Sequence, residues 1–147
     1  MDKYQLLKFE TMLILLLLSC CVSPPEHTDG LLENIPAIVD EQDFFSLSIL
    51  GDDYTETNTW DIKFLANETD IILATFILKD IKVKDTDSTY FQIFEENGDT
   101  ILSHFIQSDL TWSSQDSISV VGNPDLISFF SSNFNGRLEY QLLKITN

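Results

Sequence analysis

Hydrophobic and polar residues alternate with a period of two in several stretches after about residue 43. In the clearest stretch, Trp60, Ile62 and Phe64 fall on one side of an extended backbone, and Asp61 and Lys63 fall on the other. Such alternation is typical of a strand that buries one face and exposes the other to solvent. We therefore predict a β-strand here.

The same pattern predicts strands along the rest of the chain. They are expected at residues 45–50, 60–64, 72–76, 90–96, 99–106, 117–121, 126–130 and 137–145. After the N-terminal segment, no stretch repeats apolar residues every three or four positions, so we expect little helix. Seven or eight short strands separated by turns predict an all-β fold, specifically an antiparallel β-sandwich.

The strongest local turn signal is the dipeptide Asn97-Gly98. A two-residue type I′ turn needs positive φ at both positions, and Asn-Gly tolerates that conformation best. The turn would join 90–96 to 99–106 as a hairpin in which Ile93 lies opposite Leu102. Phe91 would then lie opposite His104, so we expect this face of the hairpin in the core.

The other face of this hairpin is more apolar than a solvated surface requires. It would carry Tyr90, Phe94, Ile101 and Phe105, which we take as a candidate binding patch. One interpretation is that loops or a neighbouring strand cover these side chains. The other is a binding surface, which would favour a protein partner.

The first 19 residues have the layout of an export signal. Lys3 and Lys8 precede the apolar run 12–18, and the small residue Ser19 follows it. Seven apolar residues are far fewer than the roughly 20 that a membrane-spanning helix needs. Asp2 and Glu10 leave the first part of this signal without net charge, where a positive charge is usual.

The segment Leu17-Leu18-Ser19-Cys20 resembles the lipobox of bacterial lipoproteins, which implies that Cys20 carries a lipid and becomes the first residue after cleavage. Two alternatives are an ordinary secretory signal and a box shifted to Cys21. Two or three acyl chains would anchor the protein essentially permanently. Because no Asp follows either cysteine, the expected location is the cell envelope, in the outer membrane, with the periplasmic or surface face left open.

The chain divides into three expected parts. Residues 1–19 form the lipoprotein signal peptide, 20–42 hold the lipidated cysteine and a flexible tether, and 43–147 form the β-sandwich domain. The tether is indicated by Pro24, Pro25, Pro36 and several acidic side chains without strand or helix periodicity.

Composition restricts the classes of partner. The formal net charge is −16, with 8 Lys and Arg against 24 Asp and Glu. Nucleic-acid binding needs clustered basic residues, so we exclude it. The acidity serves solubility, or else attracts cations or basic partners. The only cysteines, Cys20 and Cys21, are adjacent at the end of the signal and cannot crosslink the folded domain.

The order of the landmarks between Phe45 and Ile145 resembles a CUB domain, an extracellular β-sandwich module. The residues that carry the resemblance are Tyr54 to Ile62, Ile72 to Phe76, Tyr90 to Phe94, Leu102 to Phe105, Gly122-Asn123 with Leu126 to Phe130, and Gly136 with Tyr140. Asn58 stands where the family has a cysteine, and the other disulfide cysteines are absent too. The resemblance implies a binding or interaction module that is stabilised by its core alone.

Many CUB domains also bind calcium, and the corresponding positions here hold Lys84, Thr89 and Asn133. A lysine ammonium would repel the cation, so we expect no metal and no cofactor at these positions. Asp85 and Asp87 lie nearby and leave open a weak calcium site.

Catalytic chemistry is not indicated. His27 lies in the tether, and His104 would need a positioned nucleophile and an orienting acid, for which the sequence offers only scattered Ser and Asp. We therefore expect His104 to be structural and the protein not to be an enzyme. A hydrolase would require a pocket with converging polar groups.

The leading functional hypothesis is a lipid-anchored binding module that contacts another envelope protein or an extracellular glycan. The alternative is a structural accessory lipoprotein that scaffolds an envelope or secretion complex. An obligate partner would co-purify in the second case.

Overall fold

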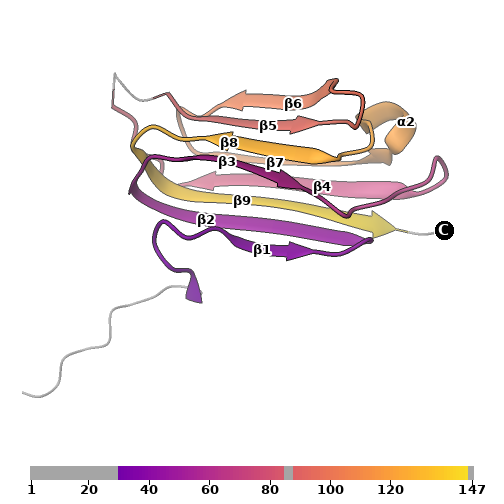
Figure 1. Cartoon of the computed structure of the whole chain (residues 1–147), viewed down its shortest axis with the longest axis horizontal. Helices are drawn as coiled ribbons and strands as arrows, with labels where there is room; N and C mark the ends of the chain where they lie inside the picture. Colours follow the sequence, from indigo (N-terminus) through magenta and orange to yellow (C-terminus); the bar gives the residue numbers. More distant parts are fainter. Residues whose placement is uncertain (1–29, 85–87, 146–147) are drawn as a thin grey trace, which may run out of the picture.

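Two antiparallel β-sheets pack face to face in the computed structural model, which describes residues 30–84 and 88–145 (Figure 1). The strands are β1 (Ala37–Asp40), β2 (Phe44–Tyr54), β3 (Thr57–Asp61), β4 (Ile71–Lys79), β5 (Tyr90–Phe94), β6 (Thr100–Phe105), β7 (Leu110–Ser117), β8 (Leu126–Phe130) and β9 (Phe134–Ile145). Sheet A has the order β1-β2-β9-β4-β7, and sheet B has the order β3-β8-β5-β6. The predicted all-β sandwich is confirmed.

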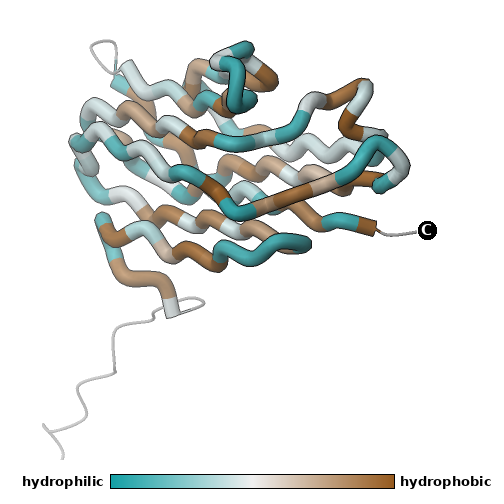
Figure 2. Tube along the Cα trace, turned by 45° about the vertical axis from the view of Figure 1, so that its right-hand side comes forward, coloured by the Kyte–Doolittle hydropathy of each residue, from teal (hydrophilic) through white to brown (hydrophobic). Residues whose placement is uncertain are grey.

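Strict alternation along the long strands forms the core. In β2 and β4 every second residue is buried, and Figure 2 shows how hydrophobic positions recur along the chain trace. Because both sheets turn these residues inward, each side chain that leaves water contributes about 1.5 to 3 kcal/mol of hydrophobic stabilisation. The largest fully buried side chains are Phe45, Phe76, Phe91, Phe129, Leu47, Ile49, Ile72, Leu78, Ile93, Ile127, Leu138 and Leu142.

Aromatic rings join the two sheets at the centre of this core. Phe76 of β4 stacks on Phe91 of β5 with ring centroids 4.9 Å apart. Tyr140 of β9 lies 5.3 Å from Phe91, and His104 of β6 meets Phe76 edge-on at 5.7 Å. Such ring pairs contribute about 0.5 to 1.5 kcal/mol each beyond the area they bury. The structure thus places His104 against the core, as the hairpin pattern predicted.

The predicted hairpin register is confirmed, but the predicted turn type is wrong. Ile93 pairs with Leu102 and Phe91 pairs with His104. Of the two turn residues only Gly98 has positive φ, at 86°. The Gly98 amide donates to the Glu95 carbonyl at 2.9 Å, and the Glu95 amide donates to the Asp99 carbonyl at the same distance. These bonds form a three-residue loop with a glycine bulge.

The strand predicted at 117–121 is wrong. Residues Ile118–Val121 form a single helical turn, α2, which ends where the Gly122 amide donates to the Ile118 carbonyl at 2.8 Å. The strand in this region is β7, which precedes the apolar run. Its sequence is mostly polar because it forms an edge of sheet A, and so the period-two pattern did not reveal it.

Two of the other differences from the prediction concern β1 and β3. Residues 37–40, which we assigned to the tether, form β1 and pair with β2 at the edge of sheet A. Four residues at an edge, none of them fully buried, give no clear periodicity. In addition, β3 ends at Asp61, although Ile62 and Phe64 are buried as their alternation predicted.

A bulge interrupts the pairing of β2 with β9. Gly51 pairs with Gly136, and the next partners are Tyr54 and Phe134, so Asp52 and Asp53 have no partner in the ladder. Gly51 lies so close to the Phe134 ring and carbonyl that an added Cβ would be 2.4 and 2.7 Å from them. Only glycine allows the two strands to approach in this way.

We predict that Gly51→Ala destabilises the domain by about 2 kcal/mol or more, because the new methyl group overlaps backbone and ring atoms that cannot both move. Chemical denaturation of the full chain would measure the loss. Gly98→Ala is the matched control, since an added Cβ there meets no atom within 4 Å, although its positive φ adds a smaller strain. Equal losses in the two variants would contradict the steric explanation.

Candidate functional site

The outer face of sheet B carries a cluster of aromatic side chains at one end. Tyr90 of β5 pairs with Phe105 of β6 on one side and with Phe130 of β8 on the other. Its ring centroid lies 4.8 Å from that of Phe105 and 6.4 Å from that of Phe130. Tyr90 and Phe130 remain 40% and 43% exposed. We call these three residues the aromatic patch.

A polar row runs beside the aromatic patch on the same face. It crosses all four strands of sheet B through Thr59, Ser128, Gln92 and Ser103. The Gln92 side-chain amide donates to the Ser103 hydroxyl at 3.1 Å. Hydroxyl and amide groups on a sheet face can exchange hydrogen bonds with a partner, so the face combines apolar and polar recognition.

The structure brings together only part of the predicted binding patch. Tyr90 and Phe105 are neighbours, whereas Phe94 lies four residues further along β5, opposite Leu126. Ile101 does not belong to the outer face. The bulge after Ile93 pairs Phe94 with Thr100 and skips Ile101, which packs against the core.

Phe130 was missed by the sequence prediction, although it lies beside Tyr90. The signal was present, because alternation in 126–130 places Phe130 on the face opposite to the buried Ile127 and Phe129. Its position next to Tyr90 depends on the pairing of β8 with β5. That pairing joins strands more than 30 residues apart and is not encoded in local sequence.

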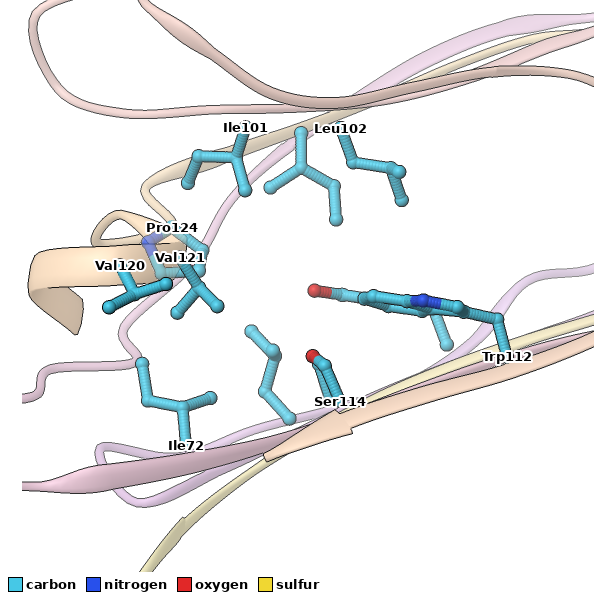
Figure 3. A pocket seen from close by; sticks show the side chains of 12 residues that line it. Ile72, Ile101, Leu102, Trp112, Ser114, Val120, Val121 and Pro124 are labelled. Carbon is cyan, nitrogen blue, oxygen red and sulfur yellow. The ribbon is translucent and has the colours of Figure 1, made fainter. Parts of the chain in front are cut away.

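A cavity of about 240 Å³ lies between the sheets, next to β7 and α2 (Figure 3). Its lining comes from both sheets and from the segment at 120–124. The lining residues are Ile72, Ala74, Ile93, Ile101, Leu102, Trp112, Ser114, Val120, Val121, Pro124, Tyr140 and Leu142. None of these side chains carries a formal charge. The sequence did not indicate this cavity.

The cavity forms where two small residues meet. Ala74 of β4 and Ser114 of β7 are direct partners in sheet A, and both line the cavity. The Ser114 hydroxyl points into the space and has no hydrogen-bond partner, although its oxygen is buried (Figure 3). A buried hydroxyl without a hydrogen-bond partner lowers the free energy of unfolding by about 1 to 3 kcal/mol. Ser114 is therefore the residue of the cavity lining whose hydrogen-bonding capacity is least satisfied.

Tyr140 also lines the cavity and is almost completely buried. Burial raises the pKa of its phenol well above the usual tyrosine value, because the phenolate would lose its hydration. The hydroxyl therefore stays protonated over the whole physiological range. It presents a neutral group that can donate one hydrogen bond.

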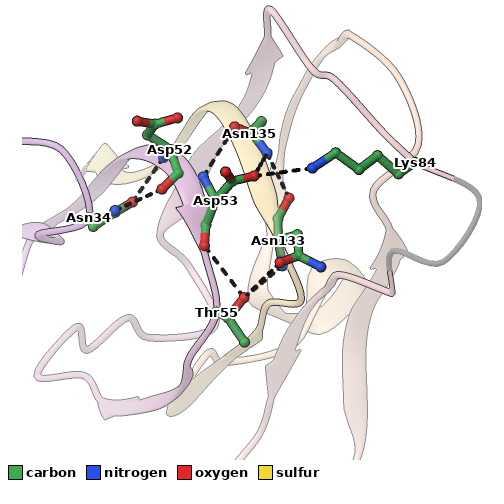
Figure 4. A network of polar contacts seen from close by, with 7 residues as sticks. All are labelled: Asn34, Asp52, Asp53, Thr55, Lys84, Asn133 and Asn135. Carbon is green, nitrogen blue, oxygen red and sulfur yellow. Dashed lines mark hydrogen bonds and ion pairs between the residues drawn. The ribbon is translucent and has the colours of Figure 1, made fainter.

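A separate polar network surrounds the bulge in β2 (Figure 4). One Asp53 carboxylate oxygen accepts a hydrogen bond from the Asn135 amide at 2.9 Å and lies 3.3 Å from the Lys84 ammonium. These contacts, with the Asn135 bond as the larger cause, lower the pKa of Asp53. The Thr55 hydroxyl accepts from the Asn133 backbone amide at 2.8 Å and thereby links the segment that follows β2 to the segment that precedes β9.

This network contains positions that the resemblance to CUB domains aligned with calcium ligands. Lys84 and Asn133 belong to it, and the Thr89 hydroxyl accepts from the Ser132 amide at 3.3 Å. The Lys84 ammonium contacts the Asp53 carboxylate at 3.3 Å. Within 30–84 and 88–145, no three His, Cys, Asp or Glu side chains converge to hold a metal ion.

Several predicted residues lie outside the part of the chain that the structure describes. They are Cys20, Cys21, His27, Asp85 and Asp87. Lipidation, the tether histidine and a weak calcium site at the two aspartates therefore stay predictions. Among the described residues, no helix is long and apolar enough to cross a membrane.

No protein-family model and no curated protein matches the chain. Two solved structures show weak similarity. One, from the disulfide-linked pili of Bacillus endospore appendages, is 10% identical with a TM-score of 0.40, covering 82% of this chain and 97% of that chain. The other, of accessory secretory proteins 1, 2 and 3 of Streptococcus pneumoniae, is 10% identical with a TM-score of 0.29, covering 84% and 93%. These similarities carry no functional argument, and the CUB resemblance stays a prediction.

We predict that the Asp53 contacts stabilise the domain at neutral pH and lose this effect in acid. A carboxyl group whose pKa is lowered on folding stabilises the fold above its ordinary value of 3.8, and the contribution disappears as pH falls through the lower folded value. Denaturant unfolding of wild type and Asp53→Asn should therefore differ at pH 7 and converge near pH 2. The exposed Glu96→Gln variant is the control. A difference that persists unchanged in acid would contradict the prediction.

Proposed function

We propose that this chain is a lipid-anchored extracytoplasmic protein whose β-sandwich binds a protein partner through the aromatic patch. The observation that carries the proposal is the exposure of Tyr90 and Phe130 on an ordered sheet face. These exposed fractions support the second of the two interpretations that the sequence left open, a binding surface. Large aromatic side chains with both apolar area and a hydroxyl dominate the binding energy of many protein interfaces.

The rigidity of the patch and the negative charge of the chain indicate the chemistry of the partner. Its rings are held by the strand ladder of sheet B, so little conformational freedom is lost on binding. The formal charge of −16 accelerates association with a basic protein and repels acidic ones. We therefore propose a partner with an apolar depression that is surrounded by Lys or Arg.

The proposed anchor leaves this face free. The chain enters the fold through β1 at the edge of sheet A (Figure 1). The aromatic patch lies on the outer side of the other sheet, sheet B. The nine residues 21–29 can span at most about 32 Å. A lipid on Cys20 would hold the domain within that distance of the membrane without covering the patch.

We predict that the full chain incorporates radiolabelled palmitate and that Cys20→Ala abolishes incorporation. The reason is that the thioether forms on the lipobox cysteine, which becomes the first residue after cleavage. Intact-mass analysis would measure the added acyl mass, and Cys21→Ala is the matched control, which should retain the label. If labelling survives in Cys20→Ala and disappears in Cys21→Ala, the lipidated residue is Cys21. An unlabelled wild type would exclude the lipid anchor.

We predict that the double variant Tyr90→Ser with Phe130→Ser loses its envelope partner in a pull-down from membranes. Removal of two aromatic anchors costs about 2 kcal/mol or more, which corresponds to about a thirtyfold loss of affinity. Leu143→Ser is the control, because Leu143 is 41% exposed on sheet A. Circular dichroism should confirm that both proteins fold. Equal recovery of the partner with both variants would exclude the patch as the binding surface.

A further inference from the structure

We propose that the cavity between the sheets binds a small, neutral, planar aromatic molecule that carries one hydroxyl or similar hydrogen-bonding group. This ligand site is separate from the aromatic patch, since the cavity lies beside β7 and α2 and its lining includes none of the three patch residues. Each property of the proposed ligand follows from a different property of the lining.

The volume sets the size of the ligand. A cavity of about 150 Å³ inside a protein accommodates benzene, with six heavy atoms. At the same filling, the 240 Å³ here would hold about ten heavy atoms, which is the size of a substituted phenol or a two-ring molecule. Most drug-sized ligands and complete lipids are too large for this space.

Because the lining carries no formal charge, we expect the ligand to be neutral. No side chain that lines the cavity is acidic or basic, so an ionised carboxylate or ammonium would enter without a counter-charge. The net charge of −16 on the chain further disfavours anions. This combination favours a neutral molecule over a fatty acid of the same size.

The arrangement of the walls favours a flat shape. Ile72 and Ala74 belong to sheet A, whereas Ile101 and Leu102 belong to sheet B, so the space is a slot between two layers. The indole ring of Trp112 borders this slot (Figure 3). A ring that enters the slot can pack against the indole, an arrangement that contributes about 0.5 to 1.5 kcal/mol beyond burial.

Two hydroxyl groups provide the polar contact. The Ser114 oxygen is buried without a partner, and the almost fully buried Tyr140 is also part of the lining. A ligand hydroxyl can donate to one of these oxygens and accept from the other. The hydrogen bond removes the penalty of the unsatisfied Ser114 group, so it contributes more here than at a solvated surface.

The ligand has a route into the cavity. On one side the cavity is closed by α2, which contributes no buried residue and in which Val120 is 68% exposed. Trp112, from the edge strand β7, is also partly exposed. Entry therefore requires displacement of surface groups only, while the ladder between β4 and β9 stays intact.

The test is ligand-observed fluorine NMR of the full chain with 4-fluorophenol as the probe. We expect binding in the micromolar to millimolar range, with weaker binding of fluorobenzene, which lacks the hydroxyl. Ser114→Ala should weaken 4-fluorophenol about two- to tenfold through loss of one hydrogen bond. Ser113→Ala is the matched control, because Ser113 neighbours Ser114 on the same strand but does not line the cavity.

Two further variants should fill the cavity. Ala74→Leu extends a side chain into it from sheet A, and Val121→Phe does so from α2, where no residue is fully buried. Both variants should abolish binding of 4-fluorophenol. If Ala74→Leu does not fold, Val121→Phe still tests the proposal.

Three results would overturn the proposal. They are no binding of 4-fluorophenol to the wild type at millimolar concentration, unchanged binding in the cavity-filling variants, and tighter binding of octanoate than of 4-fluorophenol. The last result would assign the cavity to an acyl chain instead.

Discussion

The contact between the two sheets through Phe76, Phe91 and Tyr140 is the constraint on which the structure depends. Both cysteines lie at positions 20 and 21, so no disulfide can join the layers of the sandwich, and the layers are held by noncovalent contacts. The ring cluster fixes their separation at the centre. Toward β7 the facing side chains become smaller, at Ala74 and Ser114, and the same separation then leaves an unfilled space. Tyr140 belongs to both the ring cluster and the cavity wall, so the core and the proposed ligand site share one residue.

Local alternation was sufficient to predict most of the fold. The faces of residues 45–50, 72–76 and 126–130 followed from the period of two, because each of these strands buries one complete side. The register of the hairpin followed from the position of Asn97-Gly98. The prediction failed where burial is incomplete. The edge strands β1 and β7 have too little buried area to impose a pattern, and the short apolar run 118–121 forms a helical turn that no periodicity over four residues can distinguish from a strand.

The candidate site was predictable to a smaller extent because it depends on strands that are distant in sequence. Tyr90 and Phe105 could be placed together, since they belong to one hairpin. Phe130 joins them only through the pairing of β8 with β5, and a bulge removes Ile101 from the same face. The cavity follows from the register between β4 and β7, which places two small residues side by side. Such long-range registers are set by the whole fold and leave no signature within one segment.

The position of β9 in sheet A has a consequence for biosynthesis. This strand lies between β2 and β4 and pairs with both along most of its length, so the two strands made earlier have no central neighbour until residues 134–145 have been synthesised. A sheet that is completed by contacts between sequence-distant strands forms slowly, because the loop entropy must be lost before these contacts form. Sheet A is therefore completed only after β9 has been synthesised, whereas the β5–β6 hairpin of sheet B pairs locally and does not depend on that strand.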